Sequence, residues 1–200
     1  IGAGMFEMIC SDINLPKYSR KEKRPLTRVE KDAVLIADFN DRERAFVYII
    51  YSCGLRRAEA LALSVFDFSF EAGKCTLSIT KALIFDHNTP EIKPMPKTDN
   101  GFRKLPIPDS TAAFLKEYIS KLNGTQLFTC RNGSLITQSS YVKMWKSIVC
   151  KMNHAAGGTD SFPVINGLTA HIFRHNYCTN LCYHVPEISI KKNRTAHGRY

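Results

Sequence analysis

The stretch that most constrains the fold of this 200-residue chain runs from Leu168 to Leu181. Thr169 is a suitable N-cap for a helix, and Phe173, Tyr177 and Leu181 recur at four-residue spacing after it. The spacing therefore predicts an amphipathic helix with one face against a core.

Two side chains of this expected helix suit phosphate chemistry. His171 and Arg174 stand three residues apart, which puts both on a single helical face. Arginine keeps its charge and imidazole can exchange a proton near neutral pH, so the pair fits a phosphodiester. A histidine satisfied within its helix and an arginine in solvent give the same pattern, and this stretch alone does not separate the two.

A second stretch upstream, Ser52 to Leu63, reads S-C-G-L-R-R-A-E-A-L-A-L. Gly54 is expected to make a turn that presents Arg56 at the start of a short helix ending near Leu63. Glu59 follows Arg56 by three residues and can brace its guanidinium. The alternative for Glu59 is an exposed helix carboxylate.

Together the two stretches resemble the tyrosine recombinases, the phage and transposon integrase family. The first box of that family reads G-L-R-x-x-E-x-x-x-L, and the second reads L-T-x-H-x-F-R-H. Both occur here in the expected order, and the resemblance covers about residues 26–192. The matching residues are Gly54, Leu55, Arg56, Glu59 and Leu63, followed by Leu168, Thr169, His171, Phe173, Arg174 and His175.

The resemblance implies an α+β, mainly helical catalytic domain with a small antiparallel sheet near residues 74–108. Intact relatives cut and rejoin DNA through a 3′-phosphotyrosine, without a metal or another cofactor. Arg56 and Arg174 would then hold the non-bridging phosphate oxygens, and His171 would assist proton transfer at the nucleophile. Glu59 and His175 would support these groups.

The resemblance also places a catalytic lysine on a hairpin, in a K-T-x-x-x-x-R context. Lys97 and Arg103 fit this pattern, and Lys97 would protonate the 5′-oxygen of the leaving group. Lys93 and Lys104 are weaker alternatives. A lysine on an Asn-Gly turn is otherwise a solvated residue, so only the resemblance singles Lys97 out.

A formal net charge of +10 and a pI near 9.3 indicate a polyanionic partner. Double-stranded DNA is expected, because the chain has no basic amphipathic helix for a membrane surface. Residues 16–25 are basic and lack apolar periodicity, which indicates an extended linker that contacts phosphates, or else a solvated hinge. The residues that we expect to bind DNA are Lys17, Arg20, Lys21, Lys23, Arg24 and Arg103.

Local signals predict the remaining elements. A capping box at Thr27 starts a helix towards Phe39, and an apolar helix follows over residues 44–52. A strand with one buried face is expected over residues 75–80, because Cys75, Leu77 and Ile79 alternate with polar residues. After a polar, proline-broken stretch, a second strand is expected over residues 102–107. Two further helices are expected over residues 109–122 and from Ser139. A stripe on the last of these is assigned to the core: Tyr141, Met144, Trp145, Ile148 and Met152.

Seven cysteines without a CxxC pair favour a reduced, cytoplasmic setting over a disulfide framework. The resemblance to enzymes that act on DNA implies that the protein is associated with the nucleoid. No apolar run is long enough to span a membrane. Zinc could be considered at His171, His175, Cys178 and Cys182, which lie on neighbouring helical turns. No second ligand pair is near in sequence, and relatives carry the histidine equivalent to His175 without a metal, so no metal site is expected.

Three segments are expected along the chain. Residues 1–25 are the tail of a preceding DNA-arm domain with the basic linker, residues 26–192 the catalytic domain, and residues 193–200 an aberrant or truncated tail. The chain opens on Ile1 rather than Met, which suggests missing upstream sequence. The helical pattern stops at Lys192, and reading from the second base of Asn193 permits I-A-Q-L-M-G-D-T, an amphipathic continuation of the family type. A frameshift and a gene that ends here are the two explanations.

Two residues of this tail invite comparison with the family. His197 lies 23 residues after Arg174, where relatives often have a second catalytic histidine. Tyr200 follows His197 by only three residues, too close for the family's nucleophile. The resemblance thus implies a site-specific recombinase that self-associates on DNA when intact, and the departure of this tail from the family pattern predicts that the fragment is inactive. The alternative is a non-catalytic DNA-binding remnant.

Overall fold

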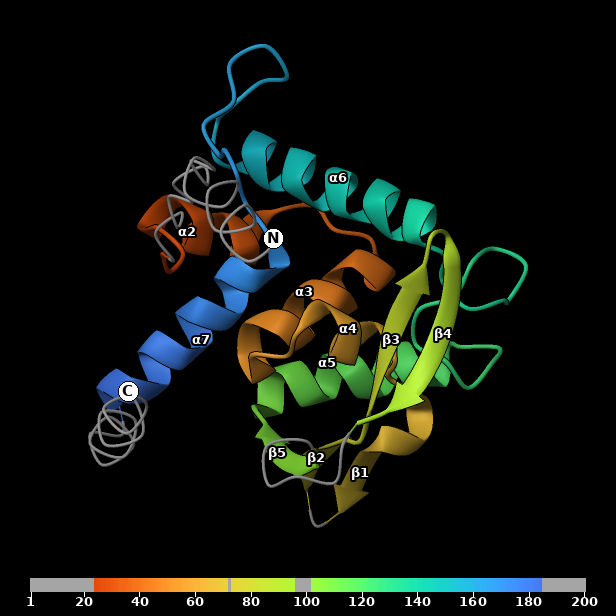
Figure 1. Ribbon diagram of the computed structural model, residues 1–200. Helices are drawn as coiled ribbons and strands as arrows, with labels where there is room; N and C mark the ends of the chain where they lie inside the picture. Colours follow the sequence, from red (N-terminus) through yellow and green to blue (C-terminus); the bar gives the residue numbers. More distant parts are fainter. Residues whose placement is uncertain (1–23, 72, 96–101, 185–200) are drawn as a thin grey trace, which may run out of the picture.

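The computed structural model describes residues 24–71, 73–95 and 102–184. Within these ranges the chain forms an α+β fold that is mainly helical and carries two small antiparallel sheets (Figure 1). The elements are α2 (Arg28–Ile36), α3 (Asp41–Cys53), α4 (Arg57–Leu61), η1 (Val65–Asp67), β1 (Phe68–Glu71), β2 (Lys74–Ile79), β3 (Lys81–Asp86), β4 (Thr89–Pro94), β5 (Arg103–Ile107), α5 (Asp109–Ser120), α6 (Gln138–Ala155) and α7 (Ala170–His184).

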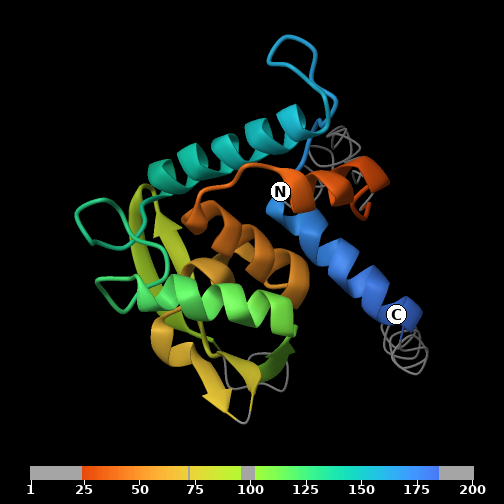
Figure 2. The same ribbon diagram turned by 180° about the vertical axis from the view of Figure 1, so that it is seen from behind.

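Helix α3 lies at the centre of the core. Its apolar residues from Ala45 to Ile50 are almost all fully buried, since α3 packs against α4, α5, α7 and strand β5. Figures 1 and 2 show α6 across one side of α3, α5 along another, and α7 beside its C-terminal half. The helix begins at Asp41 rather than at the expected Arg44, because Asn40 is its N-cap and forms a capping box with Glu43.

Helix α2 begins as its capping box predicts. The Thr27 side chain accepts a hydrogen bond from the Glu30 amide, and Glu30 accepts one from the Thr27 amide. The helix ends at Ile36 rather than near Phe39, because Ala37 has extended backbone angles.

The first sheet has the strand order β1-β2-β5, with both pairings antiparallel. In β2 the side chains of Cys75, Leu77 and Ile79 are buried while the alternate residues are not, which confirms the predicted half-buried strand. Leu77 pairs with Leu105 of β5, so this register also fixes which β5 side chains turn towards the helices.

The second sheet is the hairpin β3–β4, in a segment expected to lack strands. Pro90 and Pro94 suggested a broken stretch, but a two-stranded ribbon has free edges where proline is tolerated. The ribbon is attached to the helices by Arg57. Its guanidinium carbon lies 5.8 Å from the ring centroid of Phe85 and 5.3 Å from that of Tyr141.

Helix α6 presents the predicted stripe to the core. Tyr141, Met144, Ile148 and Met152 are buried, and Trp145 packs edge-on against core aromatic rings. The helix begins at Gln138 with Thr137 as its N-cap, slightly before the expected Ser139. Among the helices of the described ranges, none combines the length and the apolar character that crossing a membrane requires.

Candidate active site

The turn between α3 and α4 joins the two sequence boxes. Gly54 ends α3 in the left-handed region, with φ of 61°. A Cβ added to Gly54 would lie 2.2 Å from Cδ1 of Tyr177, so the glycine lets α7 pack directly on this turn. Tyr177, placed by sequence on the apolar stripe of its helix, therefore fills the space that the missing side chain leaves.

Glu59 is the buried anion of the site, with only 1% of its surface exposed. Its Oε2 accepts a hydrogen bond from the Arg56 amide at 2.8 Å, and its Oε1 accepts one from Arg56 Nη1 at 2.9 Å. The three-residue spacing predicted that Glu59 braces Arg56, and these two hydrogen bonds agree with that prediction. The side chain of Arg56 remains about half exposed, so it can still reach a ligand.

Arg103 of β5 binds the same carboxylate. Its Nη2 donates to Glu59 Oε2 at 2.6 Å, and its Nη1 donates to Oε1 at 3.3 Å. Burial tends to raise the pKa of Glu59, but hydrogen bonds and charge from Arg103 and Arg56 outweigh it and hold that pKa below its usual value. Glu59 is therefore ionised, and Arg103, expected to contact DNA directly, supports Arg56 through it.

Arg174 reaches the site from α7. Its Nη1 donates to the carbonyl oxygen of Gly54 at 2.6 Å, a contact across 120 residues of sequence. Burial lowers the pKa of Arg174, and the nearby charges of Arg56 and Arg103 lower it further against the opposing effect of Glu59. Arg174 is thus a partly desolvated cation close to two others, and an incoming anion would relieve this repulsion.

The charges of this arginine cluster (Arg56, Arg103 and Arg174 around Glu59) do not balance. Arg56 and Arg103 bind the carboxylate of Glu59, and Arg174 lies close enough to feel its charge. These three guanidinium groups and one carboxylate carry an excess of two positive charges. Guanidinium groups suit the paired oxygens of a phosphate diester, because their N–H donors form a planar fork. The cluster therefore fits a bound phosphate anion.

His171 lies one helical turn before Arg174 and is exposed. Its ring meets that of His175 edge-on, with 4.5 Å between the centroids. The structure thus brings Arg174 to Arg56, while His171 stands at the surface of the same helix beside His175.

Comparison with known proteins shows which family contains this chain. A model of the Phage integrase family matches residues 30–197. The chain belongs to the phage integrase family. A XerC-like tyrosine recombinase of Caldanaerobacter subterraneus subsp. tengcongensis is 27% identical over 83% of this chain and 48% of its own length. XerD of Oceanobacillus iheyensis is 24% identical over 93% of this chain and 58% of its own, so the chain spans about half the length of these relatives.

Solved structures share the fold. The Tn1549 transposon integrase in complex with circular intermediate DNA superposes with a TM-score of 0.67 at 21% identity, over 91% of this chain and 64% of that one. The XerH recombinase in a post-cleavage complex with its difH substrate gives a TM-score of 0.60 at 20% identity, over 94% of this chain and 51% of that one. At such identity these matches show the fold alone.

Several of the expected site residues lie outside the described part of the chain. These are Lys17, Arg20, Lys21, Lys23, Lys97 and His197. Arg24 is described and forms a bidentate pair with the buried carboxylate of Glu30, both contacts at 2.7 Å. The weaker lysine alternatives are on strands. Lys93 of β4 pairs with Glu91 at 3.2 Å, and Lys104 of β5 is exposed.

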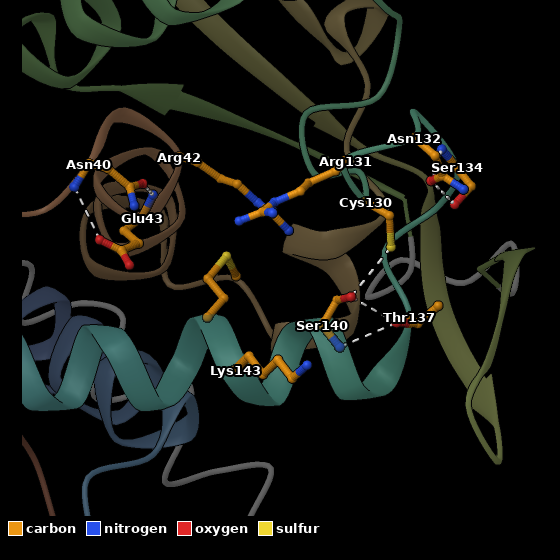
Figure 3. A pocket seen from close by; sticks show the side chains of 11 residues that line it. Asn40, Arg42, Glu43, Cys130, Arg131, Asn132, Ser134, Thr137, Ser140 and Lys143 are labelled. Carbon is orange, nitrogen blue, oxygen red and sulfur yellow. Dashed lines mark hydrogen bonds between the residues drawn. The ribbon is translucent and has the colours of Figure 1, made fainter.

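The sequence reading missed a basic cavity of about 720 Å³ between the start of α3, the 130–134 loop and α6. Figure 3 shows Arg42 and Arg131 extending towards each other over this cavity, with Lys143 on the α6 side. Arg42 Nε and Nη2 are buried and have no hydrogen-bond partner among the described residues. No local motif marks these three residues, because only the tertiary fold brings them together.

Proposed function

We propose that this chain is the catalytic part of a site-specific DNA recombinase that cleaves and rejoins strands through a phosphotyrosine intermediate. The arginine cluster carries this proposal, because its excess of two positive charges and its guanidinium donors suit a phosphodiester. The names of the XerC-like and XerD relatives support the same activity. The whole reaction belongs to the longer proteins of the family, since this chain spans about half of them.

Strand cleavage by a tyrosine concentrates negative charge on a pentacoordinate phosphorus. Arg56 and Arg174 would each donate to the non-bridging oxygens, and more strongly as that charge develops. Glu59 and Arg103 would hold Arg56 in position, so that little reorganisation is needed when the phosphate arrives. The carbonyl of Gly54 fixes the direction of Arg174 in the same way.

Proton transfers complete the proposed reaction. The tyrosine hydroxyl loses its proton as its oxygen attacks phosphorus, and His171 or His197 would assist this step. The 5′-oxygen leaves as its bond to phosphorus breaks, and Lys97 would protonate it. The position of Arg103 in the cluster supports this role for Lys97, because Arg103 follows Lys97 by only six positions along the chain.

Double-stranded DNA is the proposed partner, in a cytoplasmic protein that acts at the nucleoid and self-associates on its DNA site. The net charge of +10 supports DNA binding. The basic cavity at Arg42, Arg131 and Lys143 offers a second place for backbone phosphates. We assign the same role to the linker in residues 1–25, with residues 26–192 as the catalytic domain.

A binding-only function is the alternative, because Tyr200 stands too close to His197 for the nucleophile of the family pattern. Covalent trapping on nicked duplexes separates the two functions, and a pool of randomised sequence removes the need to know the target site. The 200-residue chain should bind without forming an adduct. The gene product continued from residue 193 in the alternative frame should form one.

Substitutions then test the site. In the continued protein, Arg174→Ala should reduce adduct formation by about 10²–10³-fold, because it removes a donor to the developing charge. Arg28→Ala, on the exposed side of α2, is the matched control and should leave the yield unchanged. DNA binding by the continued protein without any adduct would favour the binding-only function. An adduct from the 200-residue chain that disappears in Tyr200→Phe would make Tyr200 the nucleophile.

A further inference from the structure

Three metal-ligating side chains converge away from the arginine cluster, where the C-terminal end of α6 meets the following loop. Cys150 and His154 stand four residues apart on α6, and Asp160 lies on the loop. Cys150 Sγ is 3.9 Å from His154 Nε2 and 3.7 Å from Asp160 Oδ1, and the nitrogen is 3.2 Å from the same oxygen. No other group of this kind occurs in the part of the chain that the structure describes.

These separations match the edges of a tetrahedral metal site. With bonds of about 2.3 Å to sulfur and about 2.0–2.2 Å to nitrogen and oxygen, tetrahedral edges are about 3.6 Å from sulfur to either lighter atom. The edge between nitrogen and oxygen is about 3.4 Å. Each observed separation lies within about 0.4 Å of the corresponding edge, so a metal could enter with little movement of the three side chains.

A nucleophilic triad of cysteine, histidine and aspartate would be arranged differently. In a triad one ring nitrogen faces the nucleophile and the other faces the carboxylate. Here Nε2 of His154 lies close to both Cys150 Sγ and Asp160 Oδ1, so one ligand atom from each residue gathers in one place. That arrangement is typical of metal ligation.

The loop is held in this position by contacts independent of the three ligands. Asn153 is buried, and its Oδ1 accepts hydrogen bonds from the amides of Val164 at 2.7 Å and Ile165 at 3.2 Å. Its Nδ2 donates to the Thr159 carbonyl at 3.1 Å, directly before Asp160. The aspartate is thereby pre-organised near α6, which lowers the entropy lost on metal binding.

We propose that Cys150, His154 and Asp160 form a zinc site, with water as the fourth ligand. A thiolate, an imidazole and a carboxylate are the ligand types that zinc prefers, and magnesium or calcium would not select the sulfur. Cys150 binds as the thiolate and releases its proton to solvent. The metal joins α6 to the loop that leads into α7, so it would stabilise the segment ahead of Arg174.

Cobalt and zinc titrations of the metal-stripped 200-residue chain test this site. One equivalent of Co²⁺ should produce a thiolate-to-cobalt charge-transfer band, and Zn²⁺ should displace it. Cys150→Ser should abolish the band, and His154→Ala and Asp160→Asn should each weaken Zn²⁺ binding by at least about tenfold. Zn²⁺ should raise the melting temperature of the wild-type chain but not that of Cys150→Ser.

Two control variants identify the site. Cys178→Ser removes a cysteine on α7, away from the proposed site. His87→Ala removes a histidine whose Nδ1 lies 2.9 Å from a carboxylate oxygen of Asp86, a pair that includes no cysteine. Both should bind the metal as the wild type does. A band that persists in Cys150→Ser or disappears in Cys178→Ser would overturn the proposal, as would unchanged Zn²⁺ affinity in both His154→Ala and Asp160→Asn.

Discussion

Glu43 and Glu59 occupy the same position at the start of their helices, yet the charges around the two carboxylates differ. Each is the third residue of a helix, is almost fully buried, and accepts a hydrogen bond from the backbone amide of its N-cap residue. Glu43 pairs with Lys151 at 2.6 Å, whereas Glu59 binds both Arg56 and Arg103 and lies near Arg174. A similar helix start thus produces a balanced ion pair in one place and excess positive charge in the other.

The N-cap residue accounts for part of this difference. Asn40 caps α3 with its side-chain oxygen, as a capping residue normally does. Arg56 has no side-chain acceptor and makes no side-chain cap hydrogen bond at α4. The site therefore gives up a stabilising cap in order to place a guanidinium beside Gly54, which is the kind of local cost found at functional sites.

The largest expected difference between the two glutamates is in stability. Glu59→Ala leaves Arg103 desolvated beside two other cations, so we expect a loss of about 3 kcal/mol or more. Glu43→Ala removes a capping hydrogen bond but leaves only Lys151, about one-third exposed, and should cost about 1–2 kcal/mol. Denaturant unfolding at neutral pH measures both, and equal losses would contradict the distinction.

A smaller difference, between wild type and Glu59→Gln, should appear in the stability lost at acid pH. The pKa of Glu59 is held below the ordinary carboxyl value of 4.5, against burial, by its arginine partners. Stabilisation by such a group is fully present above that ordinary value and is lost as the pH falls through the lower pKa of the folded state. From neutral pH to about pH 3, wild type should therefore lose more stability than Glu59→Gln. Parallel curves would mean that Glu59 contributes no acid-sensitive stabilisation.

Sequence reasoning predicted the parts of the molecule that depend on neighbouring residues. The helix starting at Thr27, the buried face of β2 and the α6 stripe follow local signals, and the structure confirms them. The β3–β4 hairpin was missed, because Pro90 and Pro94 break strands in general but are compatible with free ribbon edges.

Within the candidate active site, only the residues of the two sequence motifs could be predicted. Arg56, Glu59 and Arg174 were identified from their motifs, whereas the position of Arg103 on Glu59 depends on the register of β5 against β2. The Cys150 group was missed for a related reason. Asp160 meets α6 only because buried Asn153 folds the loop back, and no spacing in the sequence reports that contact.

The salt dependence of duplex DNA binding tests the central claim most directly, since it needs neither a target site nor a nucleophile. Each phosphate contact adds about one to the slope of log affinity against log salt. The double variant Arg56→Ala/Arg174→Ala should therefore bind with a slope shallower by about two than the wild type. Arg28→Ala/Lys116→Ala, which removes the same charge at exposed helical positions elsewhere, should keep the wild-type slope. An unchanged slope in the first variant, or an equal change in both, would contradict a phosphate site at the arginine cluster.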